Sequence, residues 1–131
     1  MPIVVGYLAT AEGEAALEAA LAEARRREDR LVVAVSQRRG DDDAAGLEER
    51  IEAVRDRLDA EGVGYEVRQV QRGSDVADDL IAIAEETDAS LIVIGLRRRS
   101  PVGKLILGSN AQRILLDAPT PVLAVKSAGE R

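Results

Sequence analysis

Residues 91–110, LIVIGLRRRSPVGKLILGSN, carry the side chains best suited to binding chemistry. An apolar run, Leu91–Ile94, ends at Gly95, and a strongly basic segment follows it. The segment holds four positive charges, on Arg97, Arg98, Arg99 and Lys104. The formal net charge of the whole chain is −6. Because guanidinium and ammonium groups bind phosphate oxygens well, this local excess of positive charge favours a phosphate ligand; the alternative is a solvated face on which the arginines balance nearby acids.

The residues around the basic segment predict a strand, a loop and a helix in that order. The apolar run predicts a buried strand, and the chain turns at Gly108 into a helix that begins at Ser109. In an α/β fold, such a loop leaves the carboxyl end of a parallel strand and leads to the N-terminus of a helix. Free backbone N–H groups and the helix dipole make that position favourable for an anion.

The rest of the chain predicts an α/β fold in which strands and helices alternate. The strands are expected at Ile3–Leu8, Leu31–Val35, Tyr65–Val70, Leu91–Ile94 and Val122–Val125. Apolar residues at helical spacing predict four helices. The first is expected at 11–27 and the last at 110–116, and the two between them contain the apolar positions of 47–58 and 76–84. We expect Gly62 and Gly64 to close the second helix, Ser74 to cap the third, and Gln37–Gly46 to form a polar loop.

The order of the strands follows from their composition. Tyr65–Val70 alternates apolar and polar residues, which suits an edge, whereas the first and fourth strands are apolar and suit the centre of a parallel sheet with helices on both faces. Right-handed connections then give the order 3-2-1-4-5 in one domain spanning residues 1–131. The order reverses between strands one and four, and ligands bind beyond the strand ends at such a switch point.

The opposite edge of the sheet is expected to bind a second copy of the chain. Val122–Val125 is apolar, and the first charged residue after it is Lys126. An exposed apolar edge strand invites pairing with another strand. A two-fold pairing of Val122–Val125 between protomers would cover it, so we expect a homodimer.

The composition excludes several classes of function. The chain contains no Cys and no His, so it has no thiol nucleophile, no Ser-His-Asp triad and no imidazole metal ligand. Aromatic residues make up only 2% of an acidic chain, which disfavours nucleic-acid binding. No apolar stretch has the length of a membrane span and no signal segment is evident, so we expect a cytoplasmic protein without disulfides. Asp41–Asp43 lacks the spacing of a calcium loop, and no metal site is expected.

Two familiar phosphate-binding motifs are absent. Gly103 and Lys104 resemble the end of a P-loop, but Leu105 replaces the Ser or Thr that holds magnesium. No G-x-G-x-x-G sequence follows the first strand. The chain carries instead Gly95-x-x-Arg98, nine residues, and then Gly-Ser at 108–109, with a closing P-x-P-V-L-A-V-K run.

This pattern resembles the universal stress protein family, whose nucleotide-binding members carry G-x-x-G, nine residues, and then G-S or G-T. The resemblance covers the whole chain. It implies a flavodoxin-like open sheet of five parallel strands in the order derived above, and dimerisation through the last strand. It also implies a stress-response module, not an enzyme, that binds ATP or a related adenine nucleotide, with Mg²⁺ present only alongside the nucleotide.

We expect the nucleotide to lie at the switch point of the sheet. Ala9 and Thr10 would border the nucleoside, and Ile94 would pack against the base. The residues expected around the phosphate groups are Gly95, Arg97, Arg98, Gly108, Ser109 and Asn110. The guanidinium of Arg98, in the place of the second glycine of the family loop, would donate a bidentate contact to phosphate oxygens.

Two departures from the family pattern leave an alternative open. Arg98 replaces a glycine, and Leu8 stands where ATP-binding relatives often have an aspartate that contacts the nucleoside. Both favour a dimeric scaffold of the same fold that binds no nucleotide. Ser109 and Gln112 also form an S-x-x-Q capping box, which a helix uses without any ligand. Weak ATP hydrolysis ranks last, because the loop has no evident general base or magnesium ligand.

Overall fold

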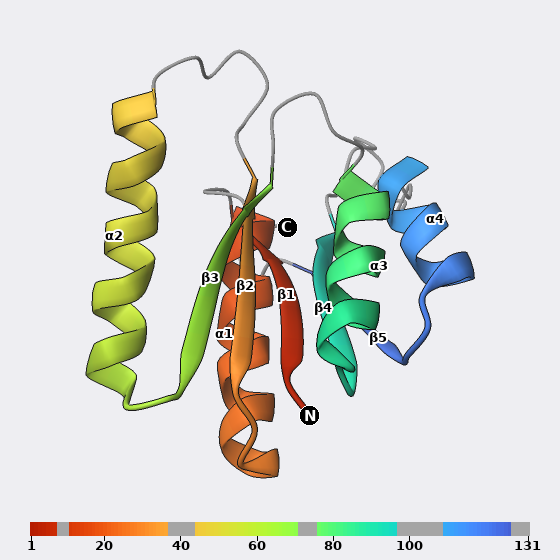
Figure 1. Ribbon diagram of the computed structural model, residues 1–131, viewed down its shortest axis with the longest axis horizontal. Helices are drawn as coiled ribbons and strands as arrows, with labels where there is room; N and C mark the ends of the chain where they lie inside the picture. Colours follow the sequence, from red (N-terminus) through yellow and green to blue (C-terminus); the bar gives the residue numbers. More distant parts are fainter. Residues whose placement is uncertain (8–10, 37–43, 71–75, 97–108, 127–131) are drawn as a thin grey trace.

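The computed structural model describes residues 1–7, 11–36, 44–70, 76–96 and 109–126. Strands and helices alternate along the chain, as the sequence predicts (Figure 1). The strands are β1 (Ile3–Tyr7), β2 (Leu31–Ser36), β3 (Tyr65–Val70), β4 (Leu91–Leu96) and β5 (Val122–Lys126). The helices are α1 (Ala11–Arg27), α2 (Ala44–Glu61), α3 (Val76–Thr87) and α4 (Ser109–Asp117).

The strands form one parallel sheet in the order β3-β2-β1-β4-β5. This confirms the predicted order and the flavodoxin-like architecture. Helices α1 and α2 cover one face of the sheet, and α3 and α4 lie side by side on the other (Figure 1). The first two connections place their helices on one face and the next two on the opposite face, because the chain reverses direction across the sheet after β3.

Small and branched aliphatic side chains fill both core layers. The layer beneath α1 and α2 includes Leu17, Leu58 and Val33, each fully buried. The layer beneath α3 and α4 includes Ile92, which is fully buried, and Ala84, which is 2% exposed. With no Phe or Trp in the chain, close packing depends on Leu, Ile, Val and Ala at the predicted helical and strand spacings.

Two element boundaries differ from the sequence prediction. Helix α2 begins at Ala44, so the last three residues of the predicted loop Gln37–Gly46 are helical. Strand β4 continues two residues beyond Ile94, because its end pairs with β5 through Gly95–Val125 and Leu96–Lys126. The glycine that the sequence suggests as a strand terminator therefore lies inside the strand.

Three other expectations concern the ends of elements. Gly62 follows α2 with a φ of 73°, a left-handed conformation that glycine adopts without steric cost, as expected for the end of this helix. Ser74 and Leu8 lie outside the described residues.

Within the described part of the chain, no helix combines the length and the apolar character needed to cross a membrane.

Candidate functional site

The central strands separate at their carboxyl ends. The ladder between β1 and β4 stops at the pair Val5–Val93. On the outer sides the ladders continue further, to Tyr7–Val35 between β1 and β2 and to Leu96–Lys126 between β4 and β5. The ends of β1 and β4 therefore pair outward and not with each other, which opens the sheet where the strand order reverses.

The first turn of α1 lies directly against the end of β4. A β-carbon placed on Gly95 would lie 2.6 Å from the carbonyl carbon of Glu12 and closer still to its carbonyl oxygen. Only a residue without a side chain fits this approach of backbone to backbone. Gly95 thus fixes the start of α1 beside the end of β4, on one face of the switch point.

On the other face, the ends of the central strands are covered by α3 and α4. Gly6 lies beneath Leu80 of α3, whose Cδ1 would be 3.1 Å from a β-carbon at position 6. Ile94 is 5% exposed and shares a core layer with Ile114 of α4. The side chain of Ile94 therefore belongs to the core on this face, and its contact with a base remains a prediction.

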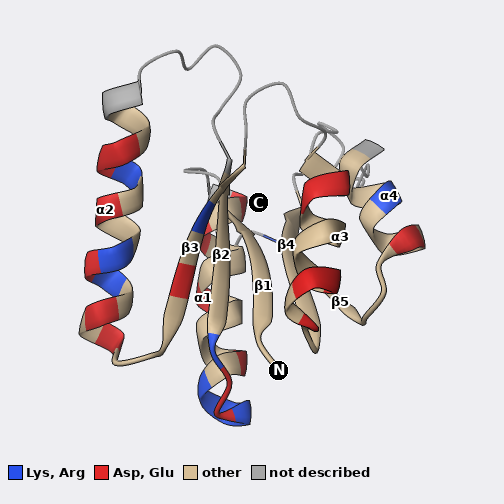
Figure 2. Cartoon of the chain, in the orientation of Figure 1, with Lys and Arg blue, Asp and Glu red and all other residues tan. Residues whose placement is uncertain are grey.

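The helix starts at this edge differ in charge. The first turn of α1 carries Glu12 and Glu14, and that of α3 carries Asp78 and Asp79. These acids already complement the positive ends of their helix dipoles. The first turn of α4 carries no acid, as Figure 2 also shows for its described part.

The start of α2 has no acid in its first turn either, but Asp41–Asp43 precede it directly in the sequence. Helix α4, by contrast, follows the uncharged residues 105–108. Among the helices of the described structure, α4 therefore has the N-terminus best suited to an external anion. Its position after β4 places that N-terminus at the switch-point edge of the sheet (Figure 1).

A polar cluster ties the end of β1 to two helices. The hydroxyl of Tyr7 donates a hydrogen bond to the carboxylate of Glu14 in α1. The other oxygen of Glu14 accepts a hydrogen bond of 2.8 Å from Arg57 in α2, and Arg57 also pairs with Glu18. The cluster joins β1, α1 and α2 beside the switch point.

The environment of Tyr7 favours its neutral form. Burial, together with the hydrogen bond to Glu14 and the charge of that carboxylate, raises the pKa of Tyr7 to about 12, although the positive charges of Arg57 and Arg50 act in the opposite direction. The side chain is 6% exposed. Tyr7 is thus a packing residue and also a hydrogen-bond donor, a role that sequence periodicity does not reveal.

The structure places some of the predicted site residues and leaves others undescribed. Ile94 and Gly95 lie at the end of β4, while Ser109 and Asn110 form the start of α4, where Asn110 is exposed. The predicted residues that lie outside the described part of the chain are Ala9, Thr10, Arg97, Arg98 and Gly108. The side chain of Ser109 is also outside it, so the capping box with Gln112 stays a prediction. The described residues contain no group of three or more His, Cys, Asp or Glu side chains suited to a metal ion.

Comparison with known proteins agrees with this architecture. A model of the universal stress protein family matches residues 1–126. A universal stress protein of Mycolicibacterium smegmatis is 45% identical over 97% of this chain and 98% of its own length. The solved structure of a universal stress protein from Archaeoglobus fulgidus has a TM-score of 0.80 and 37% identity, and the alignment covers 96% of this chain and 98% of that one. A universal stress protein from the same organism, solved in complex with dAMP, has a TM-score of 0.72 and 31% identity with the same coverage.

Proposed function

Because the chain belongs to the universal stress protein family, we propose that it binds an adenine nucleotide at the carboxyl ends of β1 and β4. The observation that carries this proposal is the early end of the β1–β4 ladder at Val5–Val93. The gap lies beside a helix N-terminus without an acid in its first turn. A relative of the same fold has been solved with dAMP.

The proposed contacts divide the site into two parts. At the phosphate end, the guanidinium of Arg98 and the amides at the start of α4 bind the anion, with Arg97, Gly95 and Gly108 beside them. At the nucleoside end, the residues are Ala9, Thr10 and Ile94. Magnesium is expected only together with the nucleotide.

The site is proposed to bind its ligand without catalysing a reaction. A chain without Cys and His has no thiol nucleophile and no imidazole base, and the sequence of the basic loop shows no evident general base or magnesium ligand. The nucleotide then acts as a signal, and the protein is a ligand-dependent sensor or partner-binding module in the stress response. The cytoplasmic location stays a prediction from the absence of cysteine and from the family.

The nucleotide proposal is tested by calorimetric titration of the chain with ATP, ADP, AMP and cAMP at moderate salt. We expect saturable binding, and we expect Arg98→Ala and Gly108→Val each to weaken it at least about tenfold, because they remove a charge-assisted contact and obstruct the turn before α4. Ala60→Lys is the control: this exposed position lies on α2, and the variant should bind like the unmodified chain.

The same titrations decide between the two candidate functions. Leu8 and Arg98 stand where ATP-binding relatives carry other residues, which favours a scaffold without a nucleotide. If none of the four nucleotides produces heat or stabilises the protein against thermal unfolding, the sensor proposal is wrong and the scaffold function replaces it.

The β5 edge supports the proposal of a homodimer. In the described part of the chain, strand β5 pairs with β4 on one side only, and the side chains of Val122–Val125 are all partly exposed. Two neighbouring leucines of α4 are also exposed, Leu115 at 41% and Leu116 at 82%. An apolar edge strand, together with exposed leucines on the helix that precedes it in the chain, is a surface that a second copy would cover through a two-fold axis.

Leu115→Lys is expected to weaken this dimer at least about tenfold, because it places a charge in the proposed apolar interface without disturbing the core. Sedimentation equilibrium of the unmodified chain and the variant measures the effect. Ala60→Lys introduces the same charge on α2, remote from β5, and should leave the dimer intact. A monomeric mass for the unmodified chain at micromolar concentration would show that β5 does not pair between protomers.

A further inference from the structure

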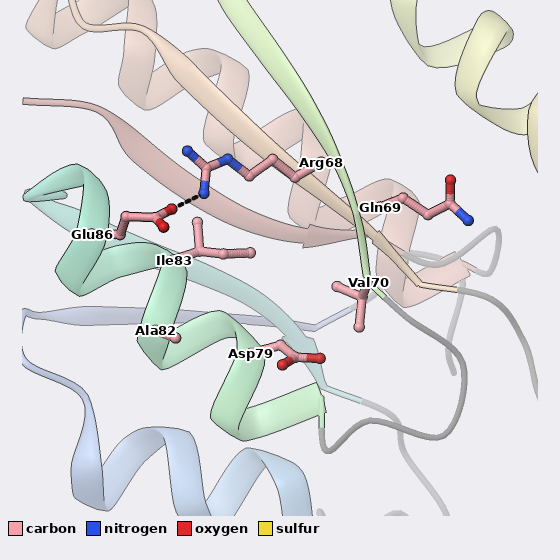
Figure 3. A pocket seen from close by; sticks show the side chains of 7 residues that line it. All are labelled: Arg68, Gln69, Val70, Asp79, Ala82, Ile83 and Glu86. Carbon is pink, nitrogen blue, oxygen red and sulfur yellow. Dashed lines mark hydrogen bonds and ion pairs between the residues drawn. The ribbon is translucent and has the colours of Figure 1, made fainter.

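A groove lies between β3 and helix α3 (Figure 3). Its volume is about 280 Å³. The residues that line it are Arg68, Gln69, Val70, Asp79, Ala82, Ile83 and Glu86. Strand β3 is an edge strand, paired with β2 on one side, so the groove runs alongside a free sheet edge in the described structure.

The groove combines an apolar floor with acidic sides. Val70, Ala82 and Ile83 supply the apolar surface, and the side chain of Val70 points from β3 toward α3 (Figure 3). Arg68 is already engaged: its Nε donates a 2.8 Å hydrogen bond to Glu66, and its Nη1 pairs with Glu86. Both hydrogen bonds raise the pKa of Arg68 above its ordinary value. This guanidinium is therefore neutralised by two carboxylates.

The carboxylate of Asp79 gives the groove an excess of negative charge. Its carboxylate is half-buried and faces Val70 across the groove (Figure 3). The described part of the structure gives it no hydrogen bond or ion pair, whereas its neighbour Asp78 pairs with Arg113 of α4. Among the described residues in and beside the groove, Glu66, Asp79 and Glu86 thus oppose the single positive charge of Arg68.

We propose that this groove docks a lysine or arginine side chain on an extended segment of a partner protein that lies along β3. The aliphatic stem of such a side chain would cover the apolar floor, and its charged end would reach Asp79. The free edge of β3 offers backbone hydrogen-bonding groups to the rest of the segment. This proposal stands apart from the nucleotide proposal, since none of the groove residues is among the proposed nucleotide contacts.

The charges argue for a basic partner and against other occupants. A second copy paired through β3 would bring two such edges together, each with three carboxylates against one arginine among the described residues, at a cost in repulsion. Nucleic acid is disfavoured by the same negative charge. The two edges of the sheet therefore differ, because β5 is apolar and suits an identical strand whereas β3 carries charges that select a basic one.

The test is a titration of the full chain, followed by NMR, with the pentapeptide acetyl-VKVKV-amide and its acidic counterpart acetyl-VEVEV-amide. We expect the basic peptide at millimolar concentration to shift the amide signals of Gln69, Val70 and Ile83, and the acidic peptide to leave them unchanged. The shifts should weaken as salt is added, because the contact with Asp79 is an exposed charge pair.

Asp79→Asn is expected to reduce the affinity for the basic peptide about three- to fivefold, as the loss of one partly exposed charge pair predicts. Asp78→Asn is the matched control. It makes the same change of charge in the same helical turn but outside the groove, and should reduce the affinity less than about twofold. The proposal would be overturned if the basic peptide did not bind or if the acidic peptide bound equally well. It would also be overturned if the two variants had equal effects, or if the shifted amide signals were centred on β5.

Discussion

Gly95→Ala is expected to lower the free energy of unfolding by about 3 kcal/mol or more, because the new methyl group meets backbone atoms that have no free space. Its β-carbon would lie 2.6 Å from the carbonyl carbon of Glu12 and 3.0 Å from the β-carbon of that residue. To relieve the overlap, the first turn of α1 must move away from β4. Denaturation by urea, followed by circular dichroism, measures the loss.

Gly6→Ala provides a matched control on the neighbouring strand. Both glycines lie in central strands, and neither has a left-handed φ, so the change in unfolded-chain entropy is the same. At position 6 the new methyl group would meet Leu80 Cδ1 at 3.1 Å, the end of a flexible side chain that can turn aside. We expect a cost of about 1 kcal/mol or less for Gly6→Ala. Equal costs at the two positions would show that α1 yields easily at the end of β4.

The prediction at Gly95 bears on the nucleotide site as well as on stability. From the sequence alone, a glycine before a basic loop indicates either a turn or a close approach to phosphate. The structure adds a third reason, since the backbone of α1 occupies the space of a side chain at this position. A glycine is therefore required here even in the scaffold that binds no ligand.

Alkaline pH is expected to destabilise the protein through Tyr7, and Tyr7→Phe should remove that sensitivity. The pKa of Tyr7 is raised from 10.0 to about 12 in the folded chain. Between these values the unfolded state loses its phenolic proton while the folded state keeps it, so the folded state binds more protons and stability falls as pH rises. The contribution is fully present below pH 10 and amounts to about 3 kcal/mol at most.

The measurement compares the free energy of unfolding at pH 9 and pH 11.5 for the unmodified chain and for Tyr7→Phe. The unmodified chain should lose more stability than the variant over this interval. Tyr65→Phe is the control for the other tyrosine, which lies at the surface and bonds to Asp59. Identical losses for the unmodified chain and Tyr7→Phe would mean that the hydroxyl of Tyr7 ionises equally easily in both states.

Much of the fold follows from local patterns in the sequence. The apolar spacing of Leu47, Ile51, Val54 and Leu58 predicts a buried helical face. Three of these side chains are buried, and Ile51 is partly buried against the same core layer. The alternation in Tyr65–Val70 predicts an edge strand, and β3 is at the edge. With right-handed connections, these local features leave one simple strand order, which the structure has. The residue types in the basic segment likewise indicate the chemistry of a ligand before any coordinates are known.

Contacts between distant parts of the chain needed the tertiary structure. The sequence determined the periodicity of each element and, with right-handed connections, the reversal of strand order, because these depend on local patterns; the anionic character of the ligand stays a prediction. It did not determine that Gly95 packs beneath Glu12, that Tyr7 donates to Glu14, or that Asp79 faces an acidic groove beside β3. Those contacts join residues on different elements, and no local spacing encodes which side chains meet once helices pack on a twisted sheet.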